Sequence, residues 1–284
     1  MVKFNSMSEY NPERARQERI EAERTEYKAI AMRVLTDLFV DVLDKGELEK
    51  RLALVDGVKF VTQSQMDVLA KENPTEAGAD GLIQYEVGKT SVRRIPIVLH
   101  SSSRADTLHT LMHEATHLMT PDSTFVHDPM AEPGEENFND YLGGLHFERN
   151  RRTKEVDLLA SRVDEDTASH ALFWEATTDW IAEFGLIDDL TDLEKEEIGT
   201  AGYFERHWIG YLIRKSPNPS ELLQAVKESY VTGNEDPLRW CLHRQLNTQD
   251  DKFFDELLKI IGRDRMDEKR VDDWIQTVDE SFKP

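Results

Sequence analysis

Apolar residues near the N-terminus recur three or four positions apart, which is the period of a helix that buries one face. Asn11 followed by Pro12 is typical of a helix start, because proline fits the first turn. The pattern predicts one helix from there to about Lys45, with Gly46 as its stop. Its first half is rich in charge and its second half is apolar. We therefore expect a helix packed on the core surface, with a regulatory or oligomerising arm as the alternative.

Shorter elements with an alternating pattern follow. The sequence predicts a strand at 58–62, a helix at 64–72, and two strands at 81–87 and 91–99. Gly88 and Lys89 separate the last two strands, which predicts a β-hairpin. Because proline cannot donate a ladder hydrogen bond, Pro96 places the second of these strands at the edge of its sheet.

Helical spacing then dominates the chain. A helix is predicted after Ser103, which precedes an aspartate by three residues as in a capping box, and Pro121 is expected to end it. Residues 120–145 are rich in Pro, Gly, Asp and Asn and predict a long loop, and residues 144–150 predict another strand. From about Asp166 onward the pattern is almost entirely helical. Breaks are predicted near residues 188–192, 216–219, 232–236 and 262–264.

Composition narrows the class of protein and its partners. The chain has 284 residues, of which 39% are hydrophobic and 32% charged, and its formal net charge is −21. Such a charge disfavours nucleic acid and anionic membranes as partners. No apolar run approaches the ~20 residues of a membrane span, and the start of the chain lacks the apolar core of a signal peptide. With Cys241 as the only cysteine, we expect a cytoplasmic protein, although secretion without such a signal stays open.

The most informative stretch for chemistry is H-E-x-x-H at 113–117. It lies in an apolar helical pattern, where residues four apart share one face, so His113 and His117 can bind one metal ion. Glu114 projects beside them, where its carboxylate can take a proton from a metal-activated water. A catalytic zinc site needs three protein ligands, so a third must come from elsewhere in the chain.

The best candidate for the third ligand is Glu175. It lies four residues before Asp179 and among aromatic residues, in a segment predicted to be a buried helix. A buried carboxylate pair needs partners, and a metal ion with a histidine provides them. In this arrangement Glu175 binds the ion, while Asp179 accepts the free N–H of a ligand histidine and fixes its ring. The alternative is an ordinary acidic pair on a helix.

H-E-x-x-H on one helix followed by E-x-x-x-D on another resembles the gluzincin class of thermolysin-like zinc metallopeptidases. The resemblance covers roughly residues 91–185. It implies that one Zn2+ ion is held by His113, His117 and Glu175. It also implies Glu114 as the general base and Asp179 as the partner of a ligand histidine. The gap between His117 and Glu175 is longer than in the thermolysin type. We therefore expect an insertion that folds out of the way or forms part of the substrate wall.

Members of this class stabilise the oxyanion of the transition state with a Tyr or a His as well as the metal. Tyr203 is the preferred candidate here, with His207 and Tyr141 as alternatives. His109, one helical turn before His113, is expected to be a bystander, and a supporting role near the site is the alternative.

The class also pairs an extended substrate with the strand that precedes the metal helix, which here is the strand at about 92–99. The substrate contacts expected on this strand are Arg93, Ile95 and Ile97. Arg93 and Arg94 either meet acidic side chains of the substrate or are solvated.

Together these patterns predict an α+β fold that is mostly helical, with a small antiparallel or mixed sheet whose edge strand lies next to the H-E-x-x-H helix. We expect an N-terminal helical extension at 1–56, a zincin-like catalytic core with the metal site at 57–186, and a helical C-terminal subdomain at 187–284. The expected function is a zinc-dependent metallopeptidase acting on a peptide or protein substrate. A regulatory or toxin-like protease with one partner protein, or an inactive zinc-stabilised binding scaffold, is the alternative. The oligomeric state stays open.

Overall fold

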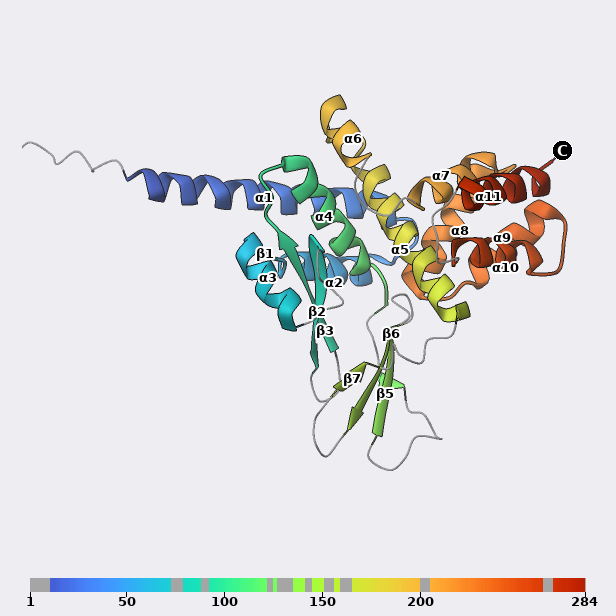
Figure 1. Cartoon of the computed structure of the whole chain (residues 1–284), viewed down its shortest axis with the longest axis horizontal. Coiled ribbons are helices and arrows are strands. Elements are labelled where there is room, and N and C mark those ends of the chain that lie inside the picture. The colour runs from blue at the N-terminus through green and yellow to red at the C-terminus, as the bar shows by residue number, and fades with distance from the viewer. Residues whose placement is uncertain are drawn as a thin grey trace, which may run out of the picture.

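The computed structural model describes residues 11–72, 79–87, 92–121, 125–126, 135–140, 145–150, 156–158, 165–199, 205–262 and 268–283. The fold is α+β and mostly helical, as the sequence predicts (Figure 1). The helices are α1 (Pro12–Phe39), α2 (Lys45–Val55), α3 (Gln63–Glu72), α4 (Arg104–His117), α5 (Glu165–Leu186), α6 (Asp192–Ile198), α7 (Arg206–Lys215), α8 (Pro219–Thr232), α9 (Asp236–Leu246), α10 (Lys252–Ile261) and α11 (Glu268–Ser281). One sheet contains β1 (Lys59–Val61), β2 (Gly81–Val87) and β3 (Val92–Leu99). A second contains β4 (Phe125–Val126), β5 (Glu135–Asp140), β6 (Leu145–Asn150) and β7 (Val156–Leu158).

The N-terminal helix is shorter than the sequence predicts. Asn11 caps α1 as expected, but the helix stops at Phe39. The predicted stop, Gly46, lies instead in the first turn of α2. The side chain of Asp44 accepts the N–H of Glu47 at 3.0 Å, so the chain caps and begins a new helix at this point.

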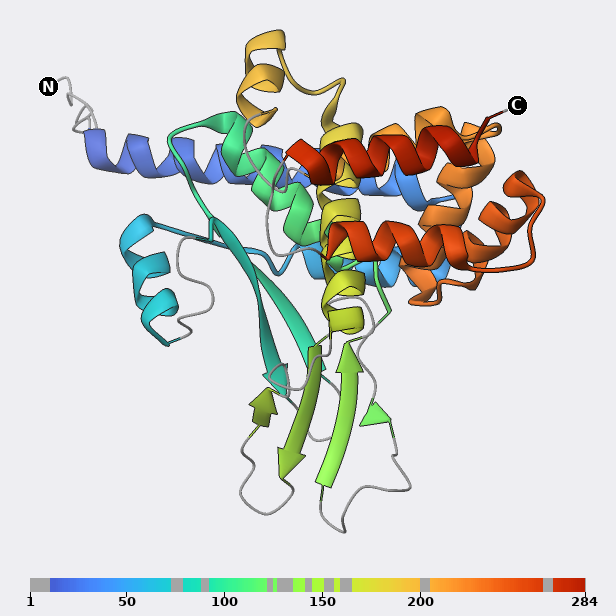
Figure 2. The ribbon, with the colours of Figure 1, turned by 45° about the vertical axis from the view of Figure 1, so that its right-hand side comes forward.

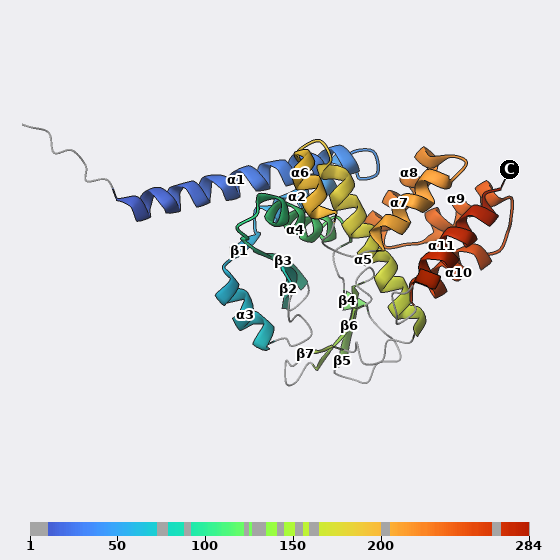
Figure 3. The ribbon, with the colours of Figure 1, turned by 45° about the horizontal axis from the view of Figure 1, so that its top comes forward.

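The two halves of α1 have different surroundings. Its buried side chains begin at Tyr27 and continue to Phe39, where the helix packs on the core. The half before Tyr27 extends away from the body of the molecule (Figure 1, Figure 2 and Figure 3). Exposed ion pairs within the helix, such as Arg14 with Glu18 at 2.8 Å, line this half. The expected packing on the core therefore holds for the C-terminal half of α1 only.

The first sheet has the strand order β1-β3-β2, with β1 parallel and β2 antiparallel to β3. The predicted hairpin of β2 and β3 is confirmed, but the prediction that β3 lies at the edge is wrong. Pro96 is tolerated because β1 pairs only with residues from Ile97 onward. His100 donates its N–H to the carbonyl of Val61, and this direction alternates along a strand. The nitrogen of Pro96 therefore faces the side of β1, just beyond the end of that strand. The edge strand that lies beside α4 is β2.

The segment predicted as a long loop, residues 120–145, contains strands. Together with β6 and β7, β4 and β5 form an antiparallel sheet in the order β4-β5-β6-β7 (Figure 2). The strand predicted at 144–150 is confirmed as β6. The sequence misses β5 because EENFND holds a single apolar residue and shows no alternation. The long insertion between α4 and α5 thus contains a sheet of its own.

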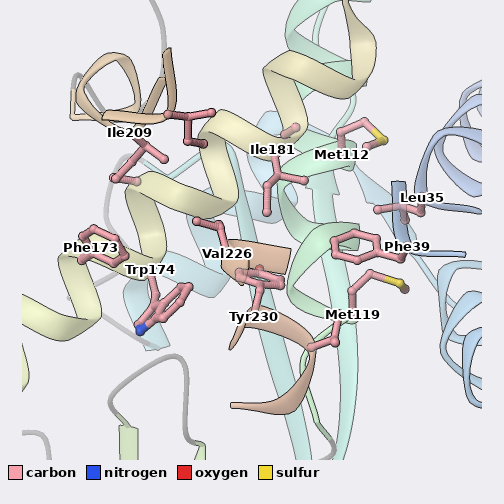
Figure 4. Close-up of a cluster of buried hydrophobic side chains, with 14 of the residues drawn as sticks. Leu35, Phe39, Met112, Met119, Phe173, Trp174, Ile181, Ile209, Val226 and Tyr230 are labelled. Carbon is pink, nitrogen blue, oxygen red and sulfur yellow. The ribbon is translucent and has the colours of Figure 1, made fainter. Parts of the chain in front are cut away.

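One hydrophobic cluster draws on all three segments expected from the sequence, so they share a core. Figure 4 shows side chains from five helical regions meeting there, and each is at most 3% exposed. They are Leu35 and Phe39, Met112 and Met119, Phe173, Trp174 and Ile181, Ile209, and Val226 and Tyr230. Because α4 and α5 both bury side chains in this cluster, close packing fixes how the two helices lie against each other.

The C-terminal part contains helices α6 to α11. The four predicted breaks are confirmed, but the sequence misses the breaks between α6 and α7 and between α9 and α10. None of the helices in the described part of the chain combines the length and the apolar character needed to cross a lipid bilayer.

Candidate metal centre

Helix α4 carries the H-E-x-x-H motif through the core. Ser103 caps it as predicted, because its Oγ accepts the N–H of Asp106 at 3.2 Å. The helix ends at His117, and Arg94 of β3 holds this end. One guanidinium nitrogen of Arg94 donates to the carbonyl of His117 at 2.8 Å, and another donates to the carbonyl of Thr120 at 2.9 Å. A cation at the last carbonyls stabilises a helix, and here it also fixes the backbone of a predicted ligand.

Glu175 of α5 faces both histidines of α4. The Nε2 atoms of His113 and His117 lie 3.2 Å apart, and Oε2 of Glu175 lies 3.5 Å from the first and 3.4 Å from the second. Zinc bonds of about 2.0–2.1 Å in a tetrahedron place ligand atoms about 3.4 Å apart. The three atoms therefore fit one face of a zinc tetrahedron and leave a fourth corner for water. Within the described residues, these three side chains are the one His, Cys, Asp and Glu group close enough to hold an ion.

Protons compete for the position that a metal ion would take. Burial would lower the pKa of His113, but hydrogen bonds to Asp179 and Glu175 raise that pKa to about 10. Burial would raise the pKa of Glu175, but the neighbouring His117 and His113 hold it far below its usual value. The metal-free site is therefore an imidazolium held against carboxylates, and a metal ion must displace that proton to bind.

Asp179 supports His113 as the sequence predicts. Nδ1 of His113 lies 3.1 Å from Oδ1 of Asp179 and donates its proton there, so Nε2 is the nitrogen that binds a metal ion once its own proton is displaced. Asp179 is 1% exposed, and its other oxygen accepts from Arg206 of α7 at 3.1 Å. Burial alone would raise the pKa of Asp179, but His113, His109 and Arg206 lower it, so the carboxylate is ionised.

Glu114 touches the first residue of the edge strand β2. A methyl group placed on Gly81 would lie 2.6 Å from Oε1 of Glu114 and 2.7 Å from Cγ2 of Thr110. Both distances are shorter than van der Waals contact, so β2 can approach α4 this closely only with glycine at position 81. The predicted general base is 6% exposed and borders the open edge of the first sheet.

The predicted substrate contacts on β3 do not lie at a sheet edge. Ile95 and Ile97 are 4% and 3% exposed, in the middle strand. The N–H of Leu99 donates to β2, and because the direction alternates, the N–H groups of Ile95 and Ile97 face β2 as well. These groups are already paired, so assigning them to a substrate edge was wrong. Arg94 is buried in its bonds to the end of α4, so it neither meets a substrate side chain nor is solvated.

The remaining predicted residues have different outcomes. Tyr203, Tyr141 and the side chain of Arg93 lie outside the described residues. His207 is exposed on the first turn of α7. His109 lies close to the site, with its Nε2 3.4 Å from Oδ1 of Asp179.

Arg206 is a buried residue beside the site that the sequence does not predict. It is 1% exposed and contacts Asp179, and its Nε donates to Glu183 at 2.7 Å. The sequence does contain a pattern that indicates burial of this arginine, because Arg206 shares a helical face with the buried residues Ile209 and Ile213. An arginine in phase with a buried stripe needs a buried anion.

No known protein family, curated protein or solved structure matches this chain. The resemblance to gluzincins therefore rests on the two sequence motifs.

Proposed function

We propose that this protein is a zinc-dependent metallopeptidase in which His113, His117 and Glu175 hold one Zn2+ ion. The supporting observation is the set of three nearly equal distances, 3.2, 3.4 and 3.5 Å, between ligand atoms from two helices. Two histidines and one carboxylate are a donor set typical of catalytic rather than structural zinc. Zinc bound there would polarise a peptide carbonyl and lower the pKa of a bound water.

In this proposal Glu114 is the general base. It follows His113 directly on α4 and is nearly buried, so its carboxylate works where solvent screens little. Glu114 takes the proton of the attacking water and passes it to the leaving amine of the cleaved bond. A site that only stabilises the fold has no need of such a base, which favours an enzyme over a zinc-stabilised scaffold.

The substrate strand in this proposal pairs with β2 rather than with β3. Asp80 accepts the N–H of Leu99, so alternate residues of β2 from Leu82 onward face β3. The backbone groups of the residues between them face the open edge of the described sheet: Gly81, Ile83, Tyr85 and Val87. An extended peptide added to this edge would begin beside Glu114, because Gly81 is the residue in contact with that base.

A cytoplasmic location is part of the proposal, because the only cysteine, Cys241, is buried and no internal disulfide is possible. The substrate is a peptide or protein, and the acidic chain favours a basic one.

The test is a cleavage profile of the wild type and of Glu114→Gln on a peptide library, with zinc content measured for both proteins. We expect one zinc per chain in each and a loss of cleavage on the order of 10²–10⁴-fold in the variant, because general base catalysis contributes about that much. Zinc bound by a wild type that cleaves nothing would leave the scaffold as the better explanation. Equal activity of the two proteins would remove Glu114 from the mechanism.

A further inference from the structure

We propose that Arg206 is a positioning residue of the metal site, which holds the Asp179 carboxylate toward His113 and away from His109. This inference rests on the proposed zinc site and goes beyond it, because it assigns a role to a residue outside the proposed ligand set.

Two imidazoles compete for one oxygen of Asp179. Oδ1 lies 3.1 Å from Nδ1 of His113 and 3.4 Å from Nε2 of His109, and both rings come from the same face of α4. In the described part of the chain, the buried Nε2 of His109 makes no hydrogen bond. His109 is therefore a ready alternative partner, and a small turn of the carboxylate would satisfy it at the expense of His113.

Arg206 decides this competition through the other oxygen. Its Nη1 donates to Oδ2 of Asp179 at 3.1 Å, which restricts rotation of the carboxylate. Within the described residues, Arg206 also donates to Glu183 at 2.7 Å and to the carbonyl of Ile198 at 2.8 Å. Asp179 and Glu183 lie one turn apart on α5, so the guanidinium spans them as a brace.

The consequence for the metal site follows from the tautomer of His113. While Oδ1 of Asp179 accepts from Nδ1, Nε2 faces Glu175 and His117 and is the nitrogen that exchanges its proton for a metal ion. If Asp179 turns to His109, neither the ring orientation nor the tautomer of His113 is fixed, and metal affinity falls. Residues that orient a ligand histidine contribute roughly 10–100-fold to metal affinity.

The experiment compares zinc affinity, measured by chelator competition, in the wild type, Arg206→Met and Arg206→Lys. The visible spectrum of each cobalt-substituted protein reports ligand geometry separately from stability. We expect Arg206→Met to bind zinc about tenfold more weakly with an altered cobalt spectrum, and Arg206→Lys to recover part of the affinity. The matched control is Arg239→Met. It removes an arginine that bonds Glu235, and Glu235 is the carboxylate partner of His170 on α5. It should leave zinc affinity and the cobalt spectrum unchanged.

Two further comparisons keep the outcome decisive. If Arg206→Met fails to fold, Glu183→Gln is the replacement variant. It weakens the contact between Arg206 and the partly exposed side chain at position 183, and it should weaken zinc binding a few fold. Zinc affinity and a cobalt spectrum equal to the wild type in Arg206→Met, or in Glu183→Gln where that variant replaces it, would overturn the positioning role. A wild type that binds no zinc would instead overturn the proposed function itself.

Discussion

Helix α5 takes part in two arrangements of one imidazole, one carboxylate and one guanidinium. At its N-terminal end, Nδ1 of His170 lies 2.5 Å from one oxygen of Glu235, and Arg239 bonds the other oxygen at 2.9 Å. Near its middle, Asp179 divides its two oxygens between His113 and Arg206 in the same way.

The two arrangements differ on the far side of the imidazole. In the described residues, only Nε2 of His113 meets a second histidine and a carboxylate. The side chain of Asp179, which holds His113 from the other side, is 2% exposed. The side chains of His170 and Glu235 are 33% and 21% exposed. A histidine, a carboxylate and an arginine bonded in series therefore join helices in both places. A metal site also requires buried ligands that converge on the histidine nitrogen that does not bond the carboxylate.

The largest test of this comparison removes the converging ligand. Glu175→Ala should reduce zinc affinity by more than the roughly 100-fold that a supporting residue contributes, because it takes away one of three direct bonds. The control, Glu235→Ala, removes the carboxylate of the other arrangement and should leave zinc affinity as it is. Chelator competition measures both, and unchanged affinity in Glu175→Ala would show that the third ligand is another residue.

A smaller effect on zinc affinity is expected when the carboxylates of Asp179 and Glu235 are replaced by amides. Asp179→Asn should weaken zinc binding by roughly 10–100-fold, because the amide no longer fixes the tautomer of His113 as an ionised acceptor does. Glu235→Gln should lower the melting temperature without altering zinc affinity. The comparison fails if both variants change zinc affinity equally, since the two arrangements would then not differ in function.

Gly81→Ala tests whether the general base can be displaced without disturbing the metal ligands. The added methyl group would meet Oε1 of Glu114 at 2.6 Å, so the carboxylate or the strand must shift. Zinc affinity should stay near the wild-type value while kcat falls by about tenfold, in line with a misplaced general base. A parallel loss of zinc would mean that β2 also supports the ligands. Gly46→Ala, at a glycine in the first turn of α2, is the control for a glycine change elsewhere.

The smallest expected effect concerns acid stability. Burial would raise the pKa of Glu235, but His170 and Arg239 lower it below its usual value. A carboxylate with a lowered pKa contributes stability above its unfolded pKa and loses that contribution as the pH falls through its folded pKa. In urea unfolding at a series of pH values, Glu235→Gln should therefore be less stable than the wild type near neutral pH. The difference should shrink as the pH falls below the ordinary glutamate pKa of about 4.3. A difference that stays constant with pH would assign the effect to packing instead.

Much of the helical pattern was readable from the sequence, and the errors have local physical causes. The capped helix after Ser103 was correct because its cap and its apolar stripe are local signals. The predicted end of α1 was wrong because Asp44 caps a second helix, which begins at Lys45. The edge position of β3 was wrong because Pro96 excludes pairing on one side of one residue, not along a whole strand.

By itself, the sequence determined that two histidines and a glutamate share one stretch of helix, because spacing within a helix is a local property of the backbone. It also named Glu175 and Asp179 as a pair, through their spacing and their aromatic neighbours. Only the tertiary structure decided that Oε2 of Glu175 lies 3.4–3.5 Å from both imidazoles, and that Arg206 and His109 meet at Asp179. These contacts join residues far apart in the chain, and their geometry is set by how α4, α5 and α7 bury their faces in one core.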